Sequence, residues 1–197
     1  QAKYGDKMSS VLDITYKRPK EFAGSATLSM LGLGAHIEGT GIKNRFTYML
    51  GVRQKSNQYL LQAQQTKGVY NPTFTDVQTY LTYQFNQAWQ VDFFGNYARN
   101  RFDFVPQSST QSFGLINKAF QLRTFFTGAE TDQFDSRYGG LSLTHTPNDR
   151  LSLKFLASGF QTNETETYDI QGEYLLGEIE TDLGKENFGE LKYALGT

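Results

Sequence analysis

The 197-residue chain contains no cysteine, so it has neither disulfide bonds nor thiolate metal sites, which fits an exported protein. Its net charge of −1 at pH 7 provides no basic surface for nucleic acid. No run approaches the roughly 20 apolar residues of a membrane-spanning helix, and the first residues lack the pattern of a signal peptide. With 38% apolar residues, of which many are aromatic, the chain is nevertheless expected to fold.

Two segments in the middle of the chain alternate apolar and polar residues. They are VQTYLTYQF, residues 77–85, and WQVDFFGNYAR, residues 89–99, with three residues between them. A strand directs successive side chains to opposite faces, so the pair predicts a hairpin with one apolar and one polar face. The function depends on whether the apolar face meets a protein core or lipid.

Strand-like segments cover nearly the whole chain, and almost nothing is helical. Most of the later ones approach the roughly 9–11 residues that cross a bilayer at a tilt, whereas soluble sheets more often use about five or six. The predicted strands are residues 10–16, 22–31, 34–39, 45–53, 74–85, 89–100, 102–114, 120–130, 136–146, 151–162, 165–176 and 188–195.

Turn-forming residues divide the connections into short turns and one long polar loop. Strict alternation of strand direction puts all the short turns at one end and the long loop at the other, if residues 102–114 form one complete strand. Pro106 weakens that strand because proline cannot donate to a ladder. This asymmetry is typical of an outer-membrane β-barrel. The short turns are residues 40–44, 86–88, 115–118 and 147–150, and the long loop is residues 55–72.

Aromatic residues flank both ends of the central strands, as the interfacial girdles of a membrane barrel do. The alternative is a soluble β-sandwich in which the same rings fill a core. The rings at one end are Tyr83, Phe85 and Trp89, and those at the other are Tyr97, Phe102 and Phe104.

The first residues, QAKYGDKMSSVLDITYKRP, carry a more specific pattern. They resemble the last strand of the plug domain of TonB-dependent outer-membrane receptors, in which a Tyr-Gly pair, small residues and an aliphatic strand with a basic end precede the barrel. The plug-end motif is matched by Tyr4, Gly5, Ser9, Ser10 and Asp13, together with Val11, Leu12, Ile14, Lys17 and Arg18.

Three later pieces resemble the early barrel of the Bacteroidetes-type receptors of this class, which often carry a carboxypeptidase-regulatory-like domain before the plug. The resemblance divides the chain into residues 1–19, the C-terminal end of the plug domain, and residues 20–197, the N-terminal part of the transmembrane β-barrel. The pieces are FAGSATLSMLGLGAHIEG, NPTFTDVQTYLTYQF and RYGGLSLTHTPNDRLSLKFLASGFQTNETETYDIQGEYLLGEI.

The resemblance implies an all-β, antiparallel, up-and-down transmembrane β-barrel. Receptors of this class have about 22 strands, so the roughly ten or eleven strands expected here make about half of a barrel. Half a barrel exposes two unpaired edges that lipid cannot satisfy, and we therefore expect the chain to be part of a longer receptor.

The implied function is TonB-dependent active uptake of a nutrient across the bacterial outer membrane. No chemistry is performed on the substrate, so we expect neither an enzyme nor a cofactor. The implied partners are a TonB-type energising protein acting through a preceding part of the receptor, the remainder of the receptor chain, a small nutrient, the lipid bilayer and a surface lipoprotein lid. Nucleic acid is not expected.

A transport lumen needs polar walls, and the alternating strands supply them. The outward positions on one strand are Leu151, Leu153, Phe155 and Ala157. The expected inward positions are Gln78, Thr82, Gln84, Gln90, Asp92, Asn96, Ser152, Lys154 and Ser158. No single residue among them is assigned to the substrate, whose identity stays open between glycan, peptide, metal chelate and vitamin.

Other chemical sites have little support in the sequence. His36 and His145 are the only histidines and lie far apart, so no metal site is expected. Two acidic groups offer oxygens suited to calcium, but solvated loop charges explain them better. The glycines of MLGLGAHIEG have the wrong spacing for a dinucleotide fingerprint, and no Gly-x-Ser-x-Gly motif is present. The acidic groups are Glu130, Asp132 and Asp135, and Glu164, Glu166 and Asp169.

Two rival functions stay open. An outer-membrane barrel enzyme needs a compact acid-base or nucleophile group near a rim, which two isolated histidines do not provide. A soluble β-sandwich that binds carbohydrate through surface aromatics would not need detergent to leave the membrane fraction, and that behaviour separates it from a barrel.

Overall fold

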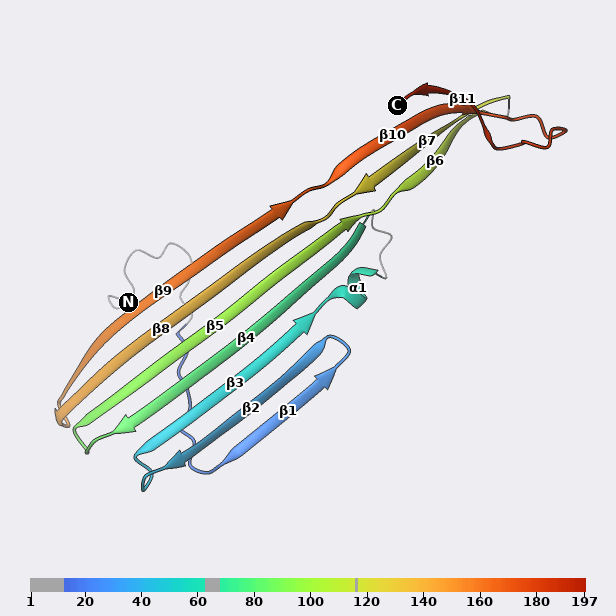
Figure 1. Ribbon diagram of the computed structural model, residues 1–197. Coiled ribbons are helices and arrows are strands. Elements are labelled where there is room, and N and C mark those ends of the chain that lie inside the picture. The colour runs from blue at the N-terminus through green and yellow to red at the C-terminus, as the bar shows by residue number, and fades with distance from the viewer. Residues whose placement is uncertain (1–12, 63–67, 116) are drawn as a thin grey trace.

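A computed structural model describes residues 13–62, 68–115 and 117–197. Within these residues the prediction of an all-β antiparallel protein is confirmed, because eleven strands accompany one short helix. The strands form two open sheets of seven and four strands, and neither closes into a cylinder (Figure 1). No helix in the described part has the length and apolar character needed to span a membrane.

The elements follow one another along the chain in the order of their labels. They are β1 Ala23–Ser29, β2 Gly32–Gly41, β3 Phe46–Ser56, α1 Gln58–Gln62, β4 Gly68–Gln84, β5 Trp89–Pro106, β6 Ser109–Leu115, β7 Lys118–Thr127, β8 Glu130–Asn148, β9 Leu151–Tyr168, β10 Gln171–Ile179 and β11 Leu191–Gly196.

The large sheet has the order β1-β2-β3-β4-β5-β8-β9, with antiparallel neighbours throughout. Its longest strands are β4, β5, β8 and β9, with 17, 18, 19 and 18 residues. These strands contain the segments in which apolar and polar residues alternate most regularly. Their length exceeds the five or six residues usual in soluble sheets.

The prediction that residues 102–114 form one spanning strand is wrong. The strand β5 continues to Pro106, β6 begins at Ser109, and β8 pairs directly with β5. The strands β6 and β7 belong to the small sheet, of order β11-β10-β7-β6, which continues beyond one end of the large sheet. The β6–β7 turn consequently lies at the end opposite the short turns, and the large sheet has seven strands rather than ten or eleven.

Three of the predicted short turns do lie together at one end of the large sheet (Figure 1). Between β2 and β3, three consecutive residues, Ile42, Lys43 and Asn44, have positive φ. Between β4 and β5, Asn86 Oδ1 accepts hydrogen bonds of 2.9 Å from the backbone N–H groups of Ala88 and Trp89. Local side-chain bonding of this kind fixes a tight turn, as expected of asparagine.

Two further expectations need correction. Residues 13–16 form no strand, whereas a strand was predicted over residues 10–16, of which 10–12 lie outside the described residues. The long loop predicted over residues 55–72 is shorter, because α1 occupies Gln58–Gln62 and β4 already begins at Gly68. Extended residues continue through Pro72, which stands opposite Phe102 of β5.

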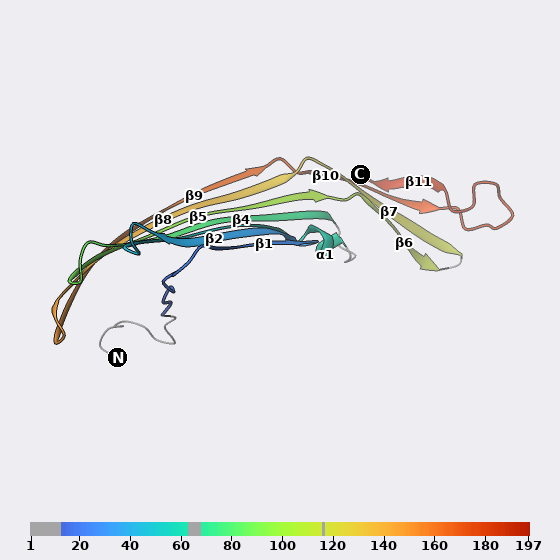
Figure 2. The same ribbon diagram turned by 90° about the horizontal axis from the view of Figure 1, so that it is seen from below.

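The large sheet is a single curved layer (Figure 2). None of the Ala, Val, Ile, Leu, Met, Phe, Trp or Tyr side chains in the described part is buried, so no hydrophobic core is present there. The segment preceding β1, residues 13–20, lies on the concave side of the curve. We call the two surfaces of the large sheet the concave face and the convex face.

Candidate functional site

A row of polar side chains crosses the concave face. Cross-strand pairing places Thr40 opposite Thr47, Thr47 opposite Thr82, Thr82 opposite Asp92, and Asp92 opposite Ser142. Thr47, Thr82, Asp92 and Ser142 are only 3–8% exposed. The best-protected side chains of the large sheet are therefore polar, and we call these five residues the polar row.

Asp92 is the centre of the polar row. Its Oδ1 accepts a 2.7 Å hydrogen bond from the Thr82 hydroxyl, and Gln90 Nε2 donates to both carboxylate oxygens at 2.7 and 2.9 Å. The Ser142 hydroxyl lies 3.5 Å from Oδ2. A buried carboxylate needs several donors to offset lost hydration, and Asp92 has them.

The N-terminal segment, residues 13–20, is held against the concave face at three points. Lys17 Nζ forms a 2.6 Å ion pair with Glu38 Oε1, and Arg18 donates to the side-chain oxygen of Gln90. The Tyr16 ring stacks on Tyr80 with centroids 4.6 Å apart and an interplanar angle of 14°. These contacts join the part of the chain that resembles a plug end to the sheet.

The predicted plug-end motif falls mostly outside this region. Tyr4, Gly5, Ser9 and Ser10 lie outside the described residues. Asp13 is described; it is exposed and borders a cavity between the segment and the sheet.

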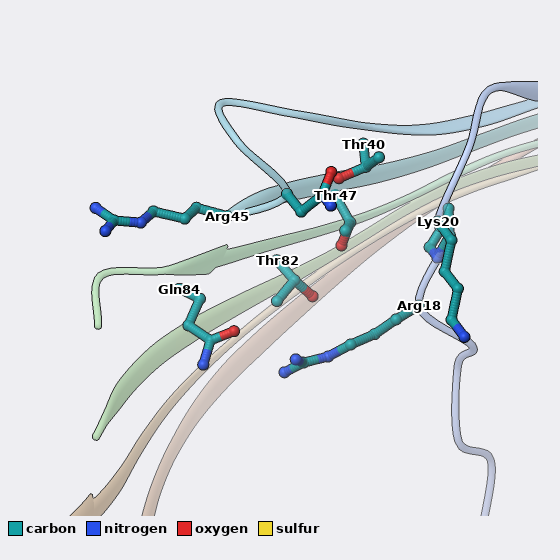
Figure 3. A pocket seen from close by; sticks show the side chains of 9 residues that line it. Arg18, Lys20, Thr40, Arg45, Thr47, Thr82 and Gln84 are labelled. Atoms are coloured by element: carbon teal, nitrogen blue, oxygen red, sulfur yellow. The ribbon is translucent and has the colours of Figure 1, made fainter. Parts of the chain in front are cut away.

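A first cavity of about 340 Å³ lies where the N-terminal segment approaches the short-turn end of the sheet. Figure 3 shows the Arg18 side chain reaching from the segment toward Thr82 and Gln84, whereas the Arg45 guanidinium points away. Among the described residues, no carboxylate lines this cavity. Its cations and hydroxyl groups make it a polar, positively charged hollow.

A second cavity of about 370 Å³ lies between residues 13–16 and strands β4, β5, β8 and β9. It combines aromatic rings with groups of both charges. The rings are Tyr16, Tyr80, Phe94 and Tyr138, and the charged residues are Asp13, Asp92 and Lys154.

The register places most of the positions that were expected to face inward on one face of the sheet. Gln78 pairs with Asn96, Thr82 with Asp92, Gln84 with Gln90, and Lys154 and Ser158 pair with Thr144 and Gly140 of β8. All of these share the face of the polar row, because same-face residues recur at every second position.

Sequence reasoning missed two apolar residues on the concave face. Leu156 and Phe160 alternate with Ser158 on β9 and pair with Ser142 and Tyr138. They are 75% and 82% exposed. Both residues have even numbers, as Lys154 does, so the alternation along β9 could have placed them on the concave face.

The convex face carries a band of apolar side chains, which is limited at both ends along the direction of the strands. In the middle of this band Phe93 pairs with Leu141, and Leu141 pairs with Ala157. Phe155 is 61% exposed and Leu141 is 50% exposed. The band extends along β5 from Trp89 to Tyr97, which is about 26 Å at roughly 3.3 Å per residue.

Rings and charges mark the two limits of this band. At the short-turn end Trp89 stacks on His145 with centroids 3.9 Å apart, and Tyr83 meets Phe85 at 4.9 Å. Beyond Tyr97 the same face becomes charged, with an Arg99–Asp135 pair at 2.7 Å. On β5 the next residue of this face after Tyr97 is Arg99, and Arg137 of β8 already stands opposite Tyr97.

The two predicted acidic groups are rearranged in the structure. Glu130, Asp132 and Glu166 come together, with one ligand atom of each within 4.8 Å of the others. Asp135 instead accepts hydrogen bonds from Arg99 and Tyr97, and Asp169 accepts one from the Ala129 N–H. The three carboxylates lie on strands β8 and β9 rather than in a loop.

The two histidines do not form a site together. His36 lies on the concave face, where its Nε2 is 3.4 Å from Glu38 Oε2. His145 lies on the convex face, stacked on Trp89. Because the sheet separates them, they cannot bind one metal ion or act on one substrate.

A further charged cluster was not foreseen from the sequence. Glu180, 4% exposed, accepts hydrogen bonds from Lys185 at 2.8 Å and from the N–H groups of Thr181 and Asp182, and it lies 3.2 Å from Lys192. The hydrogen bond from Lys185 is the main cause that lowers the pKa of Glu180 to about 2, with the Asp182 backbone N–H next. This cluster fixes the connection between β10 and β11.

No protein-family model, curated protein or solved structure matches the chain. The assignment of function therefore depends on the geometry described above and on the resemblance carried by the residues.

Proposed function

We propose that this chain forms the first part of the barrel of a TonB-dependent receptor, which takes up a nutrient actively across the bacterial outer membrane. One observation carries the proposal. A single curved sheet has an apolar convex face and a polar concave face, and the segment resembling a plug end lies in its concavity.

The apolar face supports contact with lipid rather than with a protein core. In a β-sandwich the apolar face of one sheet packs on a second sheet about 10 Å away. Here the small sheet continues the end of the large one and does not cover its convex face (Figures 1 and 2). The apolar band of about 26 Å along β5 is close to the roughly 25 Å belt of outer-membrane barrels.

The two edges of the large sheet support a longer barrel. Strands β1 and β9 each have one paired neighbour in the sheet, so one row of backbone groups on each is open. In a membrane such rows must be paired by further strands. Seven strands are about a third of a barrel with roughly 22, which reduces the earlier expectation of half.

The contacts of the N-terminal segment suit a detachable plug. One ion pair, one side-chain hydrogen bond and one ring stack hold residues 16–18 to the sheet. An energised partner pulling on the plug from the periplasm would break contacts of this individually weak kind to open a path. Uptake of this kind makes and breaks no covalent bond in the nutrient.

A labelling experiment tests the barrel. Because the 197 residues contain no cysteine, single cysteines can be placed at successive positions of β9 in the native-length protein. We expect a membrane-impermeant maleimide to label Lys154→Cys and Ser158→Cys in outer-membrane vesicles, and to spare Leu153→Cys and Phe155→Cys. Equal labelling of both sets, or recovery of the protein without detergent, would contradict the barrel and favour the soluble sandwich.

A second experiment tests uptake. The strain that encodes the chain and its deletion mutant are grown in the same complex medium, and the solutes removed from the medium are compared by mass spectrometry. We expect the parent alone to remove at least one solute, and a protonophore to abolish that removal. Chemical conversion of the solute outside the cells would instead favour a barrel enzyme.

A further inference from the structure

An apolar patch interrupts the polar concave face of the large sheet. Tyr80 pairs with Phe94, and the Phe94 ring lies 5.5 Å from Tyr138. Leu156 and Phe160 of β9 extend the patch and are among the most exposed hydrophobic residues described. A lumen wall that only conducts water-soluble material has no need for such a patch, and exposed apolar clusters commonly mark binding sites.

One end of the patch already holds an aromatic ring. Tyr16 of the N-terminal segment stacks on Tyr80 and lies 5.8 Å from Phe94. Opposite Phe94 stands Gly140, where an added Cβ would be 3.4 Å from the Tyr138 hydroxyl oxygen. Tyr16 thus shows that a flat ring fits against this wall, and the Tyr138 ring lies within ordinary contact distance of the Cβ position at Gly140 beside it.

The rest of the patch borders the second cavity, of about 370 Å³. This volume is near the lower limit of ligand pockets, roughly 300 Å³, and suits a solute the size of two amino acids. Three of its rings, Tyr80, Phe94 and Tyr138, form an aromatic wall. A ring-bearing solute gains both apolar burial and stacking there.

The same cavity has charges of both signs. Asp13 and Asp92 border it on the side of the segment and β5, and Lys154 of β9 borders it on the other side. Lys154 has no ion-pair partner in the part of the chain that is described. The strands that carry Asp92 and Lys154 are separated by β8, so their backbones are about 10 Å apart at roughly 4.8 Å per strand.

We propose that the second cavity binds a short zwitterionic peptide with an aromatic side chain. The ring lies against Phe94 and Tyr138, the carboxylate meets Lys154, and the ammonium group faces the acidic side of the cavity, where Asp13 lies and where Asp92 already accepts hydrogen bonds from Thr82 and Gln90. The strands that carry Asp92 and Lys154 are about 10 Å apart, a spacing that a dipeptide spans more readily than a single amino acid. The inference rests on the proposed function, because it takes the concave face as the inner wall of a transport path.

Isothermal titration of the native-length protein with four matched solutes tests the proposal. The probe is glycyl-tyrosine, and the other three each lack one feature: N-acetyl-glycyl-tyrosine the ammonium group, glycyl-tyrosinamide the carboxylate, and glycyl-alanine the ring. We expect each of the three to bind roughly tenfold more weakly than the probe, since hydrogen bonds to charged groups and ring contacts are worth that much.

Variants locate the site. Phe94→Leu is expected to weaken binding of glycyl-tyrosine several-fold, whereas Phe93→Leu, the neighbouring residue on the convex face, leaves it unchanged. In Lys154→Gln the difference between glycyl-tyrosine and its amide should disappear. If Phe94→Leu does not fold, the four solutes and Lys154→Gln decide on their own.

Several outcomes would overturn the proposal. They are the absence of binding, equal affinity for all four solutes, or an equal effect of Phe93→Leu and Phe94→Leu. Absence of binding would mean that another part of the protein covers the patch. Since titration needs neither a membrane potential nor an energising partner, its failure leaves the labelling result on β9 untouched, and the two proposals can fail separately.

Discussion

The hydroxyl group of Thr82 on β4 donates a 2.7 Å hydrogen bond to Asp92 on β5, and the two side chains are only 3% and 7% exposed. They lie directly opposite each other on the concave face. In most folded proteins the least exposed side chains are apolar. Here a threonine and an aspartate occupy that position, so the best-protected side chains of the large sheet lie on its polar face.

Asp92→Ala should destabilise the sheet by about 1–3 kcal/mol, because it leaves the donors of Thr82 and Gln90 without an acceptor in a protected place. Asp92→Asn keeps one acceptor oxygen and should cost less. Chemical unfolding of the native-length protein in detergent measures both changes. Asp149→Ala, at an exposed position in the β8–β9 turn, is the control. A loss no larger than that of the control would show that the polar row does not contribute to stability.

Acid should loosen the connection between β10 and β11. Lys185 and neighbouring backbone N–H groups lower the pKa of Glu180 from 4.5 to about 2. A carboxyl group with a lowered pKa stabilises the folded form above its unfolded value, and this contribution is lost as the pH falls from 4.5 toward about 2. The protection of the Thr181 and Asp182 amides, measured against the intrinsic exchange rate at each pH, should therefore fall over that range.

The matched variant for this experiment is Glu180→Gln, which cannot titrate. Its amide exchange at Thr181 and Asp182 should be faster than in the parent at neutral pH and should show no change between pH 4.5 and 2 beyond the intrinsic chemistry. Titration of the Glu180 carboxyl near 4.5 in the parent would contradict the description of this cluster.

The ion pair between Lys17 and Glu38 should hold the N-terminal segment in place. Lys17→Glu puts two carboxylates at this point, so cleavage near residues 16–18 by an added protease is expected to accelerate about fivefold, the equivalent of about 1 kcal/mol. The double variant Lys17→Glu with Glu38→Lys should return to the parent rate. Lys43→Glu, in the exposed β2–β3 turn, serves as control. Identical cleavage in all four proteins would show that the pair does not hold the segment.

The only tryptophan reports on the edge of the apolar band. Trp89 stacks on His145 at the short-turn end of the convex face. Aromatic rings of this kind lie at the level of lipid headgroups in barrels. Lipids brominated near the headgroup should therefore quench its emission more than lipids brominated near the bilayer centre, and Trp89→Phe should abolish the signal. Equal quenching at both depths, or none, would place the residue away from the interface.

How far the sequence predicts the fold differs between elements. The strands β4, β5, β8 and β9 were predicted because alternation with a period of two is a local property of the chain. The small sheet was not, because the pairing of β7 with β10 joins residues far apart in sequence. Pro106 is the last residue of β5, as expected of a residue that cannot donate to a ladder, whereas strict up-and-down order predicts a strand that continues past it.

The residues of the candidate site also fall into two groups: those that local alternation predicts and those that only the strand pairing reveals. Alternation placed Thr82 and Asp92 on one face, yet only the register shows that Thr47 and Ser142 continue the same row. The sequence did not predict the apolar patch. Leu156 lies between polar residues of the inward set, where a hydrophobic side chain is not expected.

The strands β5 and β8 continue well past the apolar band before the small sheet takes over. From Tyr97 to Pro106, β5 alone extends about 30 Å further at roughly 3.3 Å per residue. In the proposed setting this part of the sheet would extend beyond the membrane on its outer side. A large ligand approaching from outside would therefore meet this end of the sheet before it could reach the apolar band.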